Sequence, residues 1–311
     1  MDETLGLLGH PGGILVDHPR LRVGLVAAVS RPDSLELDLI GRSPRNPTSM
    51  TDPPAPRVLL PRYEEGMDLR VARLDADGRP QWMYGDTETG TGTPIDVTVV
   101  RTRLRLPPTF DSARIVLAWP EIGFPEAVVT LALPDREAVA RAATSVWTAP
   151  VDHRPPPPAT AGATASMPPL DVEPEAGLVL TGQRVLHRGD DAVVVLAWLS
   201  SVGQALALEV RSFARGRRGG AATMAAMYGP GRRTGSDGPR DHPAGASIAL
   251  LHGDGTSWPT MTSGTTSGGD DVFDGRAEYA LDRPDSDVLD LVVGWPEADL
   301  PDAHVRLPVF S

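Results

Sequence analysis

Two Trp-Pro-Glu motifs are the first candidates for chemistry in this chain. Trp119 and Glu121 lie near its middle, and Trp295 and Glu297 lie near its C-terminus. A Trp at a strand end can stack on a sugar or a base, and a nearby carboxylate can orient a ligand or transfer a proton. General acid–base catalysis, however, needs two carboxyls in different environments, and here one pattern recurs in two equivalent loops. We therefore favour a structural role, in which each Trp fills the end of a core and each Pro ends a strand.

The second candidate is an arginine-rich segment, residues 211–246, whose glycines and guanidinium groups suit contact with phosphate or RNA. The chain has a net charge of −12, which repels polyanions at long range. Nucleic acid is therefore a poor candidate partner. We expect this segment and the Pro-rich segment 43–61 to be equivalent long surface loops. The residues that could contact a ligand or partner are Arg215, Arg217, Arg218, Tyr228, Arg232 and Arg233.

The sequence gives no indication of a metal site, a reactive thiol or a catalytic lysine. The chain has no Cys, all 29 basic residues are Arg, and its seven His show no metal-binding spacing. The acidic clusters 75–77 and 270–274 predict turns, because calcium takes about six to eight oxygen ligands. Neither a Gly-x-Ser-x-Gly elbow nor a nucleotide-binding glycine motif occurs. We predict no catalytic residue, no metal ligand and no cofactor.

The elements that carry these motifs occur twice. Residues 115–121 align with 291–297 at a shift of 176, and the alternating strand 35–39 aligns with 206–210 at a shift of 171. A third pair of hairpin-like segments, each with an Asp-Gly turn, aligns at a shift of 177. Short alternating strands separated by turns are typical of antiparallel sandwiches. The sequence therefore predicts an all-β protein of two tandem β-sandwiches, Ig-like or jelly-roll-like, from an internal duplication, with one short α-helix.

Domain boundaries follow from composition. We expect a first sandwich over residues 9–149, with a C-terminal helix over 135–147 that Asp135 can cap. The Pro/Ala-rich stretch 150–171 reads as a linker. The second sandwich then covers 172–311.

The first copy resembles an actinobacterial family of proteins to which no activity has been assigned. The resemblance is carried by the Pro-rich turn 106–108, the strand ending in Trp-Pro at 115–121, the turn 122–126 and an Ala-rich helix ending at Trp147. The second copy keeps Trp-Pro-Glu at 295–297 but lacks the helix, so it looks like a diverged duplicate. The resemblance implies fold and lineage, and it implies no site residues.

The leading functional interpretation is a non-enzymatic structural or protein-interaction module, with recognition in loops on rigid sheets. One alternative is a carbohydrate or small-ligand binding module that uses its tryptophans. Another is a hydrolase with a carboxylate site at the domain seam. The N-terminus does not read as a signal peptide, and no apolar run is long enough to cross a bilayer. We therefore expect a cytoplasmic protein without membrane contact, whose partner is another protein, a second copy in a homodimer, or its own duplicate in an intrachain pseudo-dimer.

Overall fold

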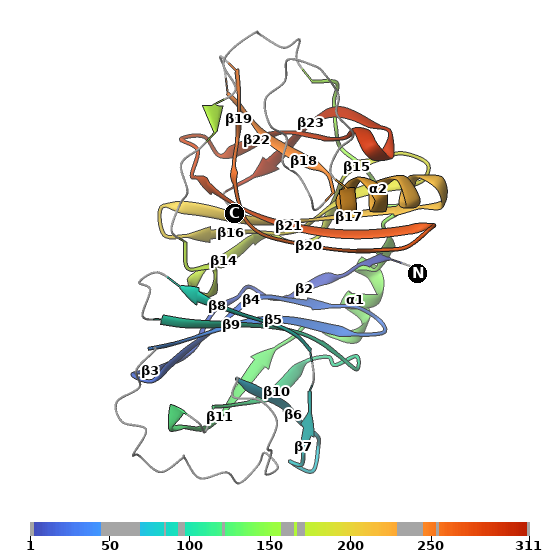
Figure 1. The fold of residues 1–311 in the computed structure, drawn as a ribbon. Coiled ribbons are helices and arrows are strands. Elements are labelled where there is room, and N and C mark those ends of the chain that lie inside the picture. Colours follow the sequence, from blue (N-terminus) through green and yellow to red (C-terminus); the bar gives the residue numbers. More distant parts are fainter. Residues whose placement is uncertain are drawn as a thin grey trace. The chain divides into compact units, whose positions relative to one another are not determined.

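A computed structural model of the protein describes residues 3–44, 69–83, 85–92, 97–119, 122–156, 165–166, 172–228, 245–252 and 255–309. The protein is all-β, with antiparallel sheets in each of two compact units (Figure 1). The first domain comprises Gly6–Ala143 and Glu173–Leu178, and the second comprises Met1–Leu5, Thr144–Val172 and Val179–Ser311.

The described residues of the first domain form two sheets. The larger has the order β2-β4-β5-β9-β8, with β3 also paired to β4, and the smaller has the order β11-β10-β6-β7. The strands are β2 (Leu7–His10), β3 (Gly13–His18), β4 (Leu21–Ser30), β5 (Leu35–Pro44), β6 (Arg70–Leu74), β7 (Pro80–Trp82), β8 (Asp86–Gly92), β9 (Val97–Leu106), β10 (Ser112–Trp119) and β11 (Phe124–Ala132).

The second domain repeats this arrangement. Its larger sheet has the order β14-β16-β17-β21-β20 with β15 on β16, and its smaller sheet has the order β13-β19-β18-β22-β23. The strands are β13 (Ala165–Ser166), β14 (Leu178–Thr181), β15 (Arg184–Arg188), β16 (Ala192–Val202), β17 (Ala205–Arg215), β18 (Ser247–His252), β19 (Gly255–Trp258), β20 (Thr260–Gly268), β21 (Val272–Asp282), β22 (Val288–Trp295) and β23 (Leu300–Pro308). The pairing of β13 with β19 is parallel.

Matching β-bulges confirm the duplication. The β4–β5 ladder shifts register just after Leu25, and the β16–β17 ladder shifts just after Leu196, which is the same position at a shift of 171. Likewise, the β10–β11 ladder shifts after Leu117 and the β22–β23 ladder shifts after Val293, at a shift of 176. Because a bulge re-aims the side chains that follow it, both copies direct equivalent residues into equivalent places.

Each domain encloses an apolar core between its two larger sheets. The first core combines leucines of β4 and β5 with side chains of β6, β10 and β11, and the second repeats the pattern with β16, β17, β18, β22 and β23. Burial of these side chains is the main stabilising term of both sandwiches.

The predicted helix over 135–147 is shorter than expected. Helix α1 spans Arg136–Ala142, and the Asp135 side chain caps it by accepting from the Ala138 amide at 2.7 Å, as the sequence predicted. From Thr144 the chain instead forms β12 (Thr144–Ser145), which pairs with β1 (Thr4–Leu5). Val146 and its neighbours then pack in a second apolar cluster of the second domain, and this packing ends the helix before Trp147.

The prediction of one long loop over 211–246 is wrong. Strand β17 continues to Arg215, and helix α2 follows over Gly216–Tyr228. The protein therefore has at least two α-helices rather than one. Residues 229–244 of this segment, and nearly all of the predicted loop 43–61, lie outside the described residues. In the part of the chain that the structure describes, no helix is long and apolar enough to span a membrane.

The compact units also divide the chain differently from the predicted boundaries at 149 and 172. A 3-10 helix, η2 (Pro174–Ala176), belongs to the first domain, where it contacts β3, β4 and β5. The side chain of Glu175 is fully buried and ion-paired with Arg42. At Gly24 a Cβ atom would lie 2.2 Å from the Glu175 carbonyl oxygen, so only glycine permits this close approach.

Candidate functional site

Both tryptophans of the repeated motif belong to the cores, as the structural interpretation predicted. Trp119 packs in the first core and Trp295 in the second, where its ring lies 5.3 Å from that of Phe273. Burial leaves neither indole face free to stack on a sugar. Glu297 is partly exposed on η3 (Pro296–Ala298), while Glu121 lies outside the described residues.

The acidic turns also have structural roles. Asp75 accepts hydrogen bonds from the amides of Asp77 and Arg79 at 2.9 and 2.8 Å, which closes the predicted turn. Asp274 pairs with Arg211 at 2.8 Å across the β17–β21 ladder. These carboxylates are therefore accounted for by turn and sheet contacts.

The candidate arginines that the structure describes do not form one basic patch. The Arg215 guanidinium stacks 4.2 Å from the ring centroid of Trp147, and its Nε lies 3.1 Å from Asp191. Arg218 pairs with Asp299, and Arg217 is exposed at the start of α2. Arg232 and Arg233 lie outside the described residues. The arginines that the structure describes mainly fix local packing.

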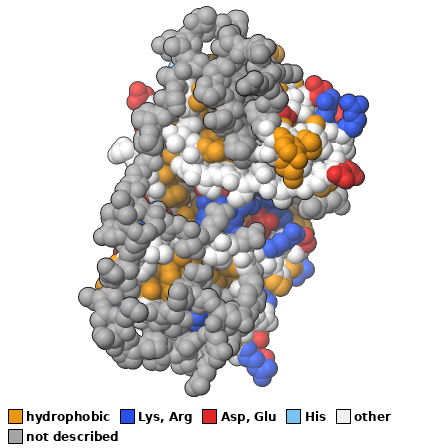
Figure 2. All heavy atoms as spheres, viewed as in Figure 1, with side chains coloured by type: hydrophobic (Ala, Val, Ile, Leu, Met, Phe, Trp, Pro, Cys, Tyr) orange, Lys and Arg blue, Asp and Glu red, His pale blue; other side chains and the backbone are white. Residues whose placement is uncertain are grey.

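Helix α2 instead presents an exposed apolar face. Met224, Met227 and Tyr228 are 56%, 67% and 78% exposed, and their spacing places them on one side of the helix. Hydrophobic side chains gather over α2 in the space-filling view (Figure 2). We refer to Met224, Met227 and Tyr228 as the α2 face.

The opposite side of α2 is firmly held on the second domain. Gly219 and Ala222 are buried, and the Thr223 hydroxyl donates to the Val272 carbonyl at 3.2 Å. A Cβ atom on Gly219 would lie 2.6 Å from the Asp271 carbonyl oxygen, so this glycine lets the helix approach the β20–β21 turn closely. The α2 face is thus carried by an anchored helix.

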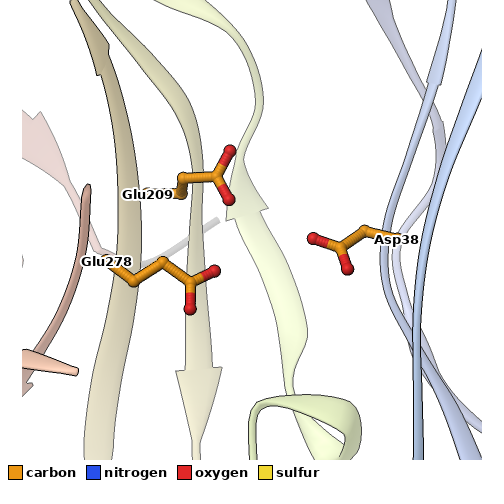
Figure 3. Close-up of side chains that lie close together, drawn as sticks. All are labelled: Asp38, Glu209 and Glu278. Carbon is orange, nitrogen blue, oxygen red and sulfur yellow. The ribbon is translucent and has the colours of Figure 1, made fainter. Parts of the chain in front are cut away.

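The larger sheets carry charged side chains at equivalent positions, drawn in Figure 3. Asp38 on β5 accepts from Arg101 on β9, with Nε–Oδ1 and Nη2–Oδ2 distances of 2.8 and 2.5 Å. Its counterpart at a shift of 171, Glu209 on β17, lies 3.2 Å from the Nε of Arg276 on β21. Glu278 stands directly opposite Glu209 in the β17–β21 register, and Figure 3 shows both glutamates directed to the same side of the sheet. Two arginines, Arg101 and Arg103, thus surround the one carboxylate Asp38 in the first sheet, whereas Arg276 offsets part of the glutamate charge in the second.

A cavity of about 570 Å³ lies in the first domain. The ends of β3, β4 and β5 form most of it, because the hairpins between these strands bring polar residues together. The start of β9 and Glu173, the residue before η2, complete the lining. Its lining consists of Asp17, His18, Pro19, Leu21, Arg22, Arg42, Ser43, Pro44, Val97 and Glu173. This volume falls in the range of small-molecule sites.

The charged side chains of the cavity are arranged in two groups. Arg42 is held by the buried Glu175 behind it, so its charge is matched. Arg22 lies at the rim, with Nε 3.3 Å from Asp17 and Nη1 3.7 Å from Glu173. The rim thus carries two carboxylates and one guanidinium.

A buried histidine lies in the second domain. His187 donates from Nε2 to the Pro301 carbonyl at 2.8 Å, and its Nδ1 accepts from the Arg188 amide at 2.9 Å. Its ring lies 4.8 Å from that of His153. Burial lowers the pKa of His187, and the nearby His153 acts in the same direction. Both ring nitrogens are engaged, so this residue has a structural role.

Sequence reasoning missed the cavity, and of the α2 face it named Tyr228 but neither methionine. The cavity draws its charges from Asp17, Arg22, Arg42 and Glu173, which no local motif connects. Helix α2 could have been found, because residues 221–227 are mostly Ala and Met, which favour a helix, but the adjacent glycines favoured a loop.

Comparisons with known proteins add no functional assignment. No protein-family model matches the chain, and no curated protein matches its sequence. Among solved structures, the chain is similar to a conserved domain protein from Bacillus anthracis, at 8% identity and a TM-score of 0.23, over 98% of this chain and 91% of that one. It is also similar to bovine butyrophilin, at 11% identity and a TM-score of 0.21, over 99% of both chains. The fold assignment therefore rests on the strand pairing itself.

Proposed function

We propose that this chain is a protein-interaction module whose binding surface is the α2 face. The observation that carries the proposal is the exposure of Met224, Met227 and Tyr228 on a helix whose opposite side is buried. An exposed apolar stripe on an anchored helix is a common basis for recognition, because binding then costs little additional ordering.

The chemistry of the α2 face indicates the kind of partner. Methionine side chains are flexible and polarizable, so they adapt to an apolar groove, while tyrosine adds a large contact area with a polar tip. Anchors spaced by three and four residues are those of a helix that docks into a hydrophobic groove. The partner is therefore a protein that offers such a groove.

A photo-crosslinking experiment tests this proposal. p-Benzoylphenylalanine is placed at Tyr228 and, as the matched control, at Val128, an apolar side chain on β11 that is 47% exposed. Both chains are irradiated in an extract of the cells that produce the protein. We expect a discrete protein adduct from position 228 that is absent from position 128.

A second variant links the adduct to the α2 face. Met224→Glu combined with Met227→Glu should abolish the adduct, because two carboxylates cannot enter an apolar groove without a large desolvation cost. Both side chains are exposed, so circular dichroism should show an intact fold. The same adducts from positions 128 and 228, or an adduct that survives the double substitution, would contradict the proposal.

A further inference from the structure

The first-domain cavity has an unequal balance of charge at its rim. Arg42 is neutralised by Glu175, which is fully buried behind it. At the rim, Arg22 is the one cation among the described residues that pairs with Asp17 and Glu173. Two carboxylates share one guanidinium, so the rim retains one negative charge.

The rim carboxylates also have unused hydrogen-bonding capacity. Asp17 accepts from Arg22 through Oδ1 at 3.3 Å, and Glu173 approaches Arg22 only to 3.7 Å, beyond hydrogen-bond range. An ionised carboxylate has about four acceptor positions. Most of those at this rim therefore remain open to a donor from a ligand.

The rest of the lining gives the ligand a shape. Leu21, Val97 and the two prolines Pro19 and Pro44 contribute apolar surface beside the charged rim. A cavity of about 570 Å³ holds a molecule of small-metabolite size. The ligand that suits this lining is a compact molecule with a positively charged nitrogen donor and an aliphatic portion.

We propose that this cavity binds a small organic cation, with an amine or guanidinium group between Asp17 and Glu173 and an aliphatic portion along the apolar wall. The bound cation completes the pairing that Arg22 provides only in part. This site lies in the first domain and does not depend on the α2 face, so either proposal can fail without the other.

Isothermal titration of the full chain with three probes of similar length tests the inference. The probes are 1,4-diaminobutane, succinate and 1,4-butanediol, at pH 7.5 and low ionic strength. We expect the diamine to bind with a dissociation constant on the order of 1 mM, as suits a ligand of so few atoms, and the other two probes to give no heat of binding. Added salt should weaken the binding of the diamine, because the site is open to solvent and its charges are screened.

Substitutions at the rim should change the affinity for the diamine in opposite directions, depending on the charge removed. Arg22→Gln removes the internal competitor for the two carboxylates, so diamine affinity should rise about tenfold. The matched control is Arg105→Gln, which removes the same charge from an exposed pair with Asp33 elsewhere in the domain and should leave affinity unchanged. Asp17→Asn should weaken binding about tenfold, while Asp33→Asn should not.

Specific results would overturn the inference. Succinate binding that Arg22→Gln abolishes would make the cavity an anion site. Absence of diamine binding by both the natural chain and the folded Arg22→Gln variant would show that the cavity has no affinity for organic cations. If Arg22→Gln and Arg105→Gln changed the affinity for the diamine equally, the interaction would be a general attraction to negative charge and not binding at this cavity.

Discussion

Replacing Glu175 by Gln is expected to release residues 173–178 from the first domain. The Glu175 carboxylate is fully buried and pairs twice with Arg42, whose side chain is 14% exposed. The substitution leaves the guanidinium in a largely desolvated place without its counter-charge. A buried charge without a partner is strongly destabilising.

The magnitude can be estimated from this geometry. Removing one partner of a buried pair costs about 3–5 kcal/mol. Because Arg42 keeps some access to water and Gln retains one acceptor, we expect the lower end, about 3 kcal/mol. Breaking the exposed Arg105–Asp33 pair by Arg105→Gln should cost at most about 1 kcal/mol.

Hydrogen exchange with mass-spectrometric detection measures this effect locally. The amides of Ala176 and Gly177 donate within η2, to Glu173 and Pro174 at 2.9 and 3.0 Å. A loss of about 3 kcal/mol corresponds to exchange roughly a hundredfold faster in a peptide that covers these amides.

The reasoning also makes a rescue prediction. Replacing both partners, with Glu175→Leu and Arg42→Met, should restore most of the protection, since apolar residues of similar volume can substitute for a buried pair. Exchange in Glu175→Gln no faster than in Arg105→Gln would refute the argument. So would a double variant as unprotected as the single one.

Three further predictions concern other parts of the fold. Gly24→Ala should also speed exchange of the 173–178 peptide, because its Cβ would lie 2.2 Å from the Glu175 carbonyl oxygen; unchanged exchange would contradict this. Trp295→Ala should lower stability to urea by about 3–5 kcal/mol, since the indole is buried in the second core, and an unchanged unfolding midpoint would refute it. Burial holds the pKa of His187 below its ordinary value, so the unfolded chain binds a proton that the folded chain does not, and stability should fall as pH drops below about 6.5. His187→Gln should flatten this dependence in urea titrations from pH 7.5 to 5.5, and an identical slope would count against the assignment.

The duplication could be predicted from the sequence, because the patterns that indicate strands and turns are local. Strands at 35–39, 115–119 and their second-domain counterparts follow from alternation or apolar runs, and the core role of Trp119 and Trp295 follows from the apolar strands that carry them. The bulges after Leu25 and Leu196 leave no comparable sequence signal, since they depend on pairing between strands.

The errors arose where tertiary contacts override local preference. Helix α1 ends at Ala142 because Val146 packs in the second domain, although its spacing continues the helix. Glycine disfavours helix by about 1 kcal/mol relative to Ala, yet α2 includes Gly219 because close packing on the β20–β21 turn requires it. The cavity was missed because its charges come from four separate segments.

Methionine oxidation footprinting tests the central proposal most directly. Met224 and Met227 are exposed on α2, whereas Met261 on β20 is partly buried and serves as the internal reference. Peroxide oxidation is compared between the purified chain and the same chain in an extract of the cells that produce it. If the α2 face is a binding surface, Met224 and Met227 should oxidise several-fold more slowly in the extract relative to Met261. Equal relative rates in both preparations would show that the α2 face remains uncovered and would contradict the proposed function.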